Sequence, residues 1–223
     1  GVVPMDWKRA NVCVIYKKGI RNVCGNYRPV SLTSQACKLF EGLIKDAISE
    51  HLHKFNLIRQ SQHGFMSHKS CLTNLLEFLE FVSKHVDNGV PVDVIYLDFK
   101  KAFDRVPHGR LLSKVKALGI NGLVAQWISN WLVDRQQRVV INGKFSQWSA
   151  VLSGVPQGSV LGPILFIIYI NDINLNINGP ILKLADDTKL FHHVSTAEDI
   201  THLRNNVHKL CQWPEDWLML FNM

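Results

Sequence analysis

The sequence lacks any hydrophobic run long enough to cross a membrane, and it shows no signal peptide pattern. Its longest apolar stretch, Leu161–Ile170, is well short of the roughly 18 residues that a membrane-spanning helix needs. We therefore expect a buried helix there, and no membrane as a partner. Internal repeats and low-complexity linkers are absent as well, which favours one continuous domain.

Cysteine is scarce, and its five occurrences form no CxxC pair of the kind found in zinc sites. An odd number without such spacing favours free thiols in a reducing compartment over a disulfide framework or a zinc centre. The ten histidines are likewise scattered along the chain. We expect them to serve in packing or at the surface, and not as metal ligands. The cysteines are Cys13, Cys24, Cys37, Cys71 and Cys211.

Apolar residues and positive charge are what the sequence has in quantity. Hydrophobic residues make up 47% of the 223 positions, which is typical of a folded globular protein with a real core. The 25 Lys and Arg residues exceed the 18 Asp and Glu residues, so the formal net charge is +7 at pH 7. This surplus favours polyanionic partners such as nucleic acid, although many soluble proteins are mildly basic.

The N-terminal part, to about Gly89, has mostly helical periodicity. An apolar stripe predicts a helix over Ala36–Leu52, and a second helix is expected from near Ser70 to Asn88-Gly89. Val92–Phe99 then reads as a nearly continuous apolar strand, which we expect to be buried on both faces. The stripe of the first helix comprises Leu39, Leu43, Ile44, Ala47, Ile48 and Leu52.

The second half of the chain mixes helices with hairpins. Leu111–Leu132 is predicted to be helical with a glycine-containing interruption, and Ala197–Leu220 is predicted to be helical apart from Pro214. Arg138–Trp148 is predicted to be a hairpin in which Asn142-Gly143 forms a type I′ turn. Helices and hairpins around a central sheet indicate the α+β class.

The pair Asp186-Asp187 stands between two short apolar runs, a pattern that predicts a β-hairpin with both carboxylates at its tip. An exposed turn without further role is the alternative. Asp98 ends the predicted strand, so all three carboxylates converge if that strand and the hairpin lie side by side. Clustered carboxylates need cations, and Mg²⁺ prefers oxygen ligands together with substrate phosphates. Two such ions would suit phosphoryl transfer.

Seven segments carry recognisable motifs, among them YLDFKKAFDRVPH, SGVPQGSVLGPILFIIYINDI and LKLADDTKLF. Taken in order, they resemble the reverse transcriptases of LINE-type (non-LTR) retrotransposons, particularly the jockey-like group. The first three look like that family's finger motifs, and the last looks like the segment after its catalytic hairpin. The segments are Val14–Gly19, Asn26–Ser34, Ser61–Phe65, Tyr96–His108, Ser153–Ile173, Leu182–Phe191 and Asp216–Asn222.

The resemblance implies an α+β right-hand polymerase fold with fingers, a palm built on an antiparallel sheet, and the thumb absent. Fingers are expected at about 1–90 and 113–150, and the palm at about 91–112 and 151–223. The implied activity is that of an RNA-directed DNA polymerase, which uses an RNA template, a DNA primer and deoxynucleoside triphosphates. The family also implies a larger polyprotein with an endonuclease, found as a ribonucleoprotein in the nucleus and cytoplasm.

The resemblance assigns the catalytic metal site to carboxylates. Asp98 and Asp186 are expected to hold two Mg²⁺ ions, with Mn²⁺ as a substitute. Asp187 would stand alongside, and the carbonyl of Phe99 would be a further ligand. Asp104 is instead expected to have a structural hydrogen-bonding role.

Nucleotide contacts follow from the same resemblance. Phe103 matches the steric gate that excludes ribose, with core packing as the alternative. Gln157 and Gly158 match positions that touch the incoming nucleotide and template. The finger cations that grip the triphosphate match Lys17, or Lys18 in its place, and Arg28, against the alternative of solvated surface charges. Trp127, Trp131, Arg135 and Arg138 could line a nucleic-acid surface or belong to the core.

Some positions depart from the family pattern. Leu184 stands where an aromatic residue is common, Cys13 replaces a frequent proline, and Pro214 falls inside the expected last helix. The chain also ends before a lysine that the family uses as a general acid. An inactive remnant that binds nucleic acid is therefore the alternative function. An RNA-templated RNA polymerase is disfavoured, because the gate at Phe103 would exclude its substrates.

Overall fold

The computed structural model describes residues 2–222. Their contacts divide them into two compact units. The first comprises the chain up to Phe55 together with Phe103–Phe166, and the second comprises Asn56–Ala102 together with the chain from Ile167 onward. The predicted division into fingers and palm is a functional one, and it stays a prediction.

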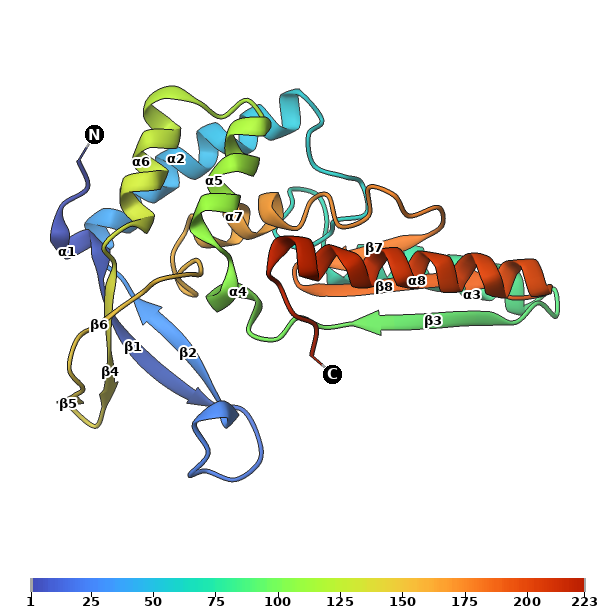
Figure 1. Cartoon of the computed structure of the whole chain (residues 1–223), viewed down its shortest axis with the longest axis horizontal. Helices are drawn as coiled ribbons and strands as arrows, with labels where there is room; N and C mark the ends of the chain where they lie inside the picture. The colour runs from blue at the N-terminus through green and yellow to red at the C-terminus, as the bar shows by residue number, and fades with distance from the viewer. Residues whose placement is uncertain (1, 223) are drawn as a thin grey trace. The chain divides into compact units, whose positions relative to one another are not determined.

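A five-stranded sheet organises the first unit (Figure 1). Strand β1 pairs antiparallel with β2 and parallel with β4, which in turn pairs with β5 and β6. Asn142 and Gly143, with φ angles of 49° and 75°, join β4 to β5, so the predicted hairpin and its turn are confirmed. The strands are β1 (Arg9–Tyr16), β2 (Tyr27–Leu32), β4 (Gln136–Ile141), β5 (Lys144–Phe145) and β6 (Ser149–Ala150).

Helices of the first unit follow the predicted periodicity. The helix expected over Ala36–Leu52 is present, and the region Leu111–Leu132 is two helices separated at its glycines. A short 3-10 helix, Cys24–Asn26, lies between β1 and β2. The helices are α1 (Met5–Lys8), α2 (Gln35–Lys54), α5 (His108–Ala117) and α6 (Gly122–Leu132), while α4 (Ala102–Arg105) and α7 (Gly162–Tyr169) cross the boundary between the units.

The predicted apolar stripe of α2 is partly wrong. Leu39 and Leu43 are 77% and 69% exposed, whereas Glu41 is fully buried. The carboxylate of Glu41 accepts hydrogen bonds from the backbone N–H groups of Val160 and Leu161, at 2.7 and 3.2 Å, just before α7 begins. A helix leaves such donors unpaired, which explains why a charged residue occupies a core position. The buried face comprises Cys37, Glu41, Ile44, Ile48 and Leu52.

All five cysteines are free, as predicted. Burial, followed by the neighbouring charge of Glu41, raises the pKa of the Cys37 thiol to about 12. The thiolate is the reactive form, so Cys37 is inert at neutral pH. The apolar helix predicted near Leu161–Ile170 is α7, which is buried except at the half-buried Pro163. Within residues 2–222, none of the helices combines the length and apolar character needed to span a bilayer.

The second unit contains an antiparallel three-stranded sheet, in which β8 lies between β3 and β7 (Figure 1). The strand predicted after Gly89 is therefore present, but its burial on both faces is wrong. Tyr96 is 68% exposed, and Asp93 is exposed as well. An edge strand has a neighbour on one side only, so its side chains are less shielded. The strands are β3 (Val92–Leu97), β7 (Ile181–Leu184) and β8 (Asp187–His193).

Two long helices pack on this sheet. Helix α3 (Cys71–Val86) begins after its N-cap Ser70, as predicted, and places Phe78 and Phe81 edge-on against Phe191 of β8. Helix α8 (Ala197–Trp217) contacts β8. It includes Pro214 in its last turn, where the missing N–H of the proline costs the helix one backbone hydrogen bond. The predicted exclusion of Pro214 from the helix is therefore wrong.

Candidate active site

Strand register brings the three predicted carboxylates to one end of the second unit's sheet. The ladder between β3 and β8 ends at the pair Leu97↔Thr188. Asp98 follows Leu97 directly, and Asp187 directly precedes Thr188. Asp186 belongs to the turn that connects β7 to β8. Asp98, Asp186 and Asp187 therefore share one end of the sheet, as predicted, and their role as metal ligands stays a prediction.

The hairpin tip differs from the prediction by one residue. Leu184 pairs with Asp187, so the turn consists of Ala185 and Asp186, and Asp187 is the first residue of β8. Ala185 has a φ of 55°, a conformation that an L-residue rarely adopts without support. The sequence alone could not show whether the turn is Asp186-Asp187 or Ala185-Asp186, because an aspartate favours a turn at either position.

The support for this turn comes from Gln62, which the sequence analysis did not single out. Its side-chain oxygen accepts hydrogen bonds from the N–H groups of Ala185 (3.0 Å) and Gly64 (2.8 Å). Ser61 and His63 extend the contact, since they exchange backbone hydrogen bonds with Lys183 at 2.7 and 2.8 Å. The segment Ser61–Phe65, predicted to be a finger motif, therefore supports the β7–β8 hairpin within the second unit.

A glycine is required at this brace. A Cβ atom on Gly64 would lie 2.3 Å from the backbone nitrogen of Ala185, closer than any real contact allows. The conformation of the hairpin tip thus depends on a glycine some 120 positions earlier in the chain (Ala185 − Gly64 = 121).

The end of β3 is held by the last described residues. Asn222 donates from its side chain to the Asp98 carboxylate at 3.2 Å and from its backbone to the Asp98 carbonyl at 2.8 Å. Lys100 donates its N–H to the Leu220 carbonyl, and Phe99 stacks on Phe221 with ring centroids 4.8 Å apart. Phe99 and Phe221 form an antiparallel bridge whose two hydrogen bonds are made by the neighbours of Phe99. The carbonyl of Phe99 therefore takes no part in the bridge.

The carboxylates fit a hard divalent cation. Asp98 and Asp187 are exposed and Asp186 is half-buried, so their oxygens are accessible from solvent. Three carboxylates and a backbone carbonyl are oxygen donors of the kind that Mg²⁺ prefers. Like charges at one sheet end repel one another unless a cation lies between them.

Residues with predicted nucleotide contacts belong to the first unit. Lys17, Lys18 and Arg28 are exposed on the hairpin formed by β1 and β2, with Arg28 opposite Ile15. Phe103 is half-buried and stacks on Phe166, with centroids 4.6 Å apart. This stacking favours a packing role for one face of its ring, and its role as a steric gate stays a prediction.

Gln157 and Gly158 lie beside β2. The Gln157 carbonyl accepts a hydrogen bond from the Ser31 N–H at 2.7 Å. Gly158 has a φ of 116°, and a Cβ there would lie 2.6 Å from the Ser31 carbonyl oxygen. A glycine is needed at position 158 because the backbone of Ser31 lies too close for a side chain. The contacts of Gln157 and Gly158 with nucleotide and template stay predictions.

Other aromatic and basic candidates lie mainly in the core. Trp127, Trp131 and Arg135 are buried. They belong to the core, and the alternative prediction that they line a nucleic-acid surface is wrong. Arg138 is half-buried over the rings of Phe145 and Trp148, at 4.0 and 4.5 Å. The backbone carbonyl of Asp104 accepts a hydrogen bond from the Ser153 hydroxyl at 2.9 Å, and the structural role predicted for the Asp104 side chain stays a prediction.

The sequence matches one family model, described as "Reverse transcriptase (RNA-dependent DNA polymerase)", over residues 15–223. Among curated proteins, it is 28% identical over 229 residues to a probable RNA-directed DNA polymerase from transposon BS of Drosophila melanogaster, with 98% of this chain covered. It is 31% identical over 232 residues to the RNA-directed DNA polymerase from mobile element jockey of Drosophila funebris, with 100% of this chain covered. The chain spans about a quarter (25%) of each relative.

Solved structures of telomerase share the fold. The Candida albicans telomerase, solved with a fragment of telomeric RNA, superimposes with a TM-score of 0.69 at 12% identity, covering 100% of this chain and 43% of that one. The apo telomerase of Candida tropicalis, truncated from its C-terminal domain, gives a TM-score of 0.66 at 14% identity, covering 99% and 50%. The predicted polymerase fold is confirmed, and so is the resemblance to the jockey-like elements.

We predict that Gly158→Ala destabilises the first unit. The new methyl group meets the Ser31 carbonyl, and the positive φ strains any L-residue, so the free energy of unfolding should fall by about 1–3 kcal/mol. Gly109→Ala is the matched control, because a Cβ there meets nothing within 4 Å in helix α5. Urea denaturation measures both; equal stability of the two variants would contradict the tight approach of Gly158 to β2.

Proposed function

Because the chain belongs to the reverse transcriptase (RNA-dependent DNA polymerase) family, we propose that it carries the polymerase site of a jockey-like non-LTR retrotransposon. In this proposal, it transfers deoxynucleotides to a DNA primer on an RNA template. The observation that carries the proposal is the convergence of Asp98, Asp186 and Asp187 at one end of the β3–β8–β7 sheet. The relatives from the jockey elements are named RNA-directed DNA polymerases, which supports the same reaction.

Asp98 and Asp186 would bind two Mg²⁺ ions, or Mn²⁺ in their place, with Asp187 and the Phe99 carbonyl as further ligands. When bound, the ions supply positive charge to the α-phosphate and favour deprotonation of the primer 3′-hydroxyl. Asn222 and Gln62 act as positioning residues. Asn222 orients the carboxylate of Asp98, and Gln62 fixes the backbone on which Asp186 lies.

The first unit would bind the incoming nucleotide. The Arg28 guanidinium suits bidentate binding of phosphate, and Lys17 or Lys18 contributes a point charge. Gln157 and Gly158 would contact nucleotide and template, and Phe103 would exclude the ribose 2′-hydroxyl. The net charge of +7 and the RNA-bound telomerase of the same fold support a nucleic-acid substrate.

The larger setting of the chain is also part of the proposal. Because the chain spans about a quarter (25%) of relatives such as the BS and jockey polymerases, we propose that it acts within a larger polyprotein that includes an endonuclease. A ribonucleoprotein of that kind would act in both the nucleus and the cytoplasm.

Primer extension on poly-rA annealed to oligo-dT with Mg²⁺ tests the reaction. We expect incorporation by the chain, and a loss of at least about 100-fold in Asp186→Asn, because one carboxylate ligand is worth several kcal/mol of transition-state stabilisation. Asp46→Asn, whose side chain is 73% exposed on α2, is the matched control and should leave the rate unchanged.

Either of two outcomes would count against the proposal. Equal rates in the chain and in Asp186→Asn would show that the carboxylates are not the catalytic centre. If both were folded and silent while RNA binding persisted, the chain would be a binding remnant without catalysis.

The same assay with ribonucleotides tests the gate. We expect Phe103→Val to raise ribonucleotide incorporation at least about tenfold relative to deoxynucleotides, since one steric contact is worth 1–3 kcal/mol of discrimination. Phe145→Val, which alters an exposed ring on β5, should leave the ratio unchanged. An unchanged ratio in Phe103→Val would assign Phe103 to packing against Phe166 alone.

A further inference from the structure

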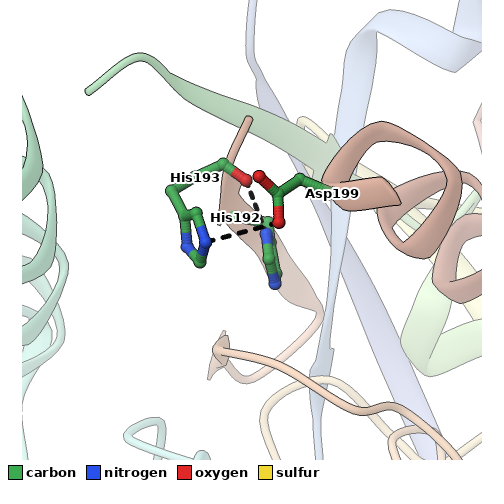
Figure 2. Close-up of side chains that lie close together, drawn as sticks. All are labelled: His192, His193 and Asp199. Atoms are coloured by element: carbon green, nitrogen blue, oxygen red, sulfur yellow. Dashed lines mark hydrogen bonds and ion pairs between the residues drawn. The ribbon is translucent and has the colours of Figure 1, made fainter. Parts of the chain in front are cut away.

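Figure 2 shows a second cluster of metal-ligating side chains. It lies at the end of β8 opposite to Asp187. It joins His192 and His193, the last two residues of β8, to Asp199 in the first turn of α8. Among residues 2–222, these three offer ligand atoms that all lie within 4.8 Å of one another. The length of β8 separates them from Asp187 by roughly 20 Å, so the two sites are distinct.

The carboxylate of this cluster is held in place by the helix cap. One oxygen of Asp199 accepts hydrogen bonds from the N–H groups of Ser195 and Thr196, at 3.0 and 2.9 Å. The other oxygen lies 3.4 Å from Nε2 of His193 (Figure 2). In a tetrahedral zinc site with bonds of about 2.0–2.1 Å, neighbouring ligand atoms lie about 3.4 Å apart. The pair His193–Asp199 therefore already has the spacing of two zinc ligands.

The third ligand atom needs only a small rearrangement. Nδ1 of His192 lies 2.6 Å from the His193 carbonyl oxygen, on the side of the ring that faces Asp199 (Figure 2). A shift of the ring proton to Nε2 would free the Nδ1 lone pair, and a rotation of the ring away from the His193 carbonyl would point that lone pair toward the cluster. The same carbonyl oxygen would then be free to serve as a weak additional donor.

Further histidines surround these three residues. The ring of His85, on α3, stacks on His193 at 5.3 Å with an interplanar angle of 6°, and its Nδ1 donates to the Phe81 carbonyl. The ring of His202 lies 4.9 Å from His192, one helical turn after Asp199, and its buried Nδ1 lacks a hydrogen-bond partner in the described part of the chain. His202 is therefore a candidate fourth ligand.

We propose that His192, His193 and Asp199 form a binding site for a divalent transition metal, zinc in particular. Imidazole nitrogens with one carboxylate select zinc and its neighbours over Mg²⁺, which requires oxygen ligands. A bound ion would link the end of β8 to the start of α8, and would thereby stabilise the second unit. This site is independent of the proposed polymerase reaction.

Calorimetric titration of the metal-stripped, untagged chain with Zn²⁺ in excess Mg²⁺ tests the proposal. We expect one ion per chain with a dissociation constant of about 1 µM or tighter, and a rise in the unfolding temperature on zinc addition. His193→Gln and His192→Gln should each weaken binding at least about tenfold, as loss of a ligand does. His208→Gln, exposed on the same helix, is the matched control and should bind like the parent.

Circular dichroism of the metal-free variants verifies that each is folded. Substitution of Co²⁺ then reports the ligands, because a tetrahedral site with nitrogen donors gives visible absorption bands that His193→Gln should abolish. Absence of saturable zinc binding would overturn the proposal. The proposal would also be overturned if zinc binding weakened less than tenfold in both His192→Gln and His193→Gln. The zinc would then be bound by other donors, such as the exposed thiols of Cys24, Cys71 and Cys211.

Discussion

The backbone pairing of β8 with a strand on each side is the interaction on which the candidate site of the second unit depends. Asp98, Asp186 and Asp187 are brought together by the pairing of β3 with β8 and of β8 with β7. Hydrogen bonds to neighbouring groups hold the backbone in this arrangement: Gln62 and Gly64 brace the turn at Ala185, and Asn222 holds the end of β3. The fold thus fixes a concentration of negative charge that a divalent cation would neutralise.

Local patterns predicted the elements well because hydrophobic periodicity and turn chemistry act over a few residues. The hairpin at Asn142-Gly143, the N-cap at Ser70 and the buried helix α7 were all readable from short segments. The errors arose where tertiary contacts override local pattern. Glu41 takes a core position in α2 because α7 begins beside it, and β3 is an edge strand although its composition is that of a buried one.

The site itself was predictable only in part. The resemblance supplied the three aspartates, and strand register confirms that they converge. Gln62 could not have been identified as a positioning residue, since its partner Ala185 lies 123 residues away along the chain. The histidine cluster is a similar case: His85, His192 and His202 come from three elements that only folding brings together. Nothing in the spacing of these three and His193 distinguishes them from the other six of the ten histidines.

Direct measurement of metal binding at the carboxylates tests the central claim. Mn²⁺, which replaces Mg²⁺ at oxygen sites, can be titrated into the chain and its free fraction followed by electron paramagnetic resonance, with Zn²⁺ present to occupy the histidine cluster. The account predicts saturable Mn²⁺ binding that Mg²⁺ displaces and that Asp98→Asn weakens at least about tenfold, while Asp46→Asn leaves it unchanged. Equal Mn²⁺ binding by the parent and Asp98→Asn would contradict the assignment of this end of the sheet as the metal site.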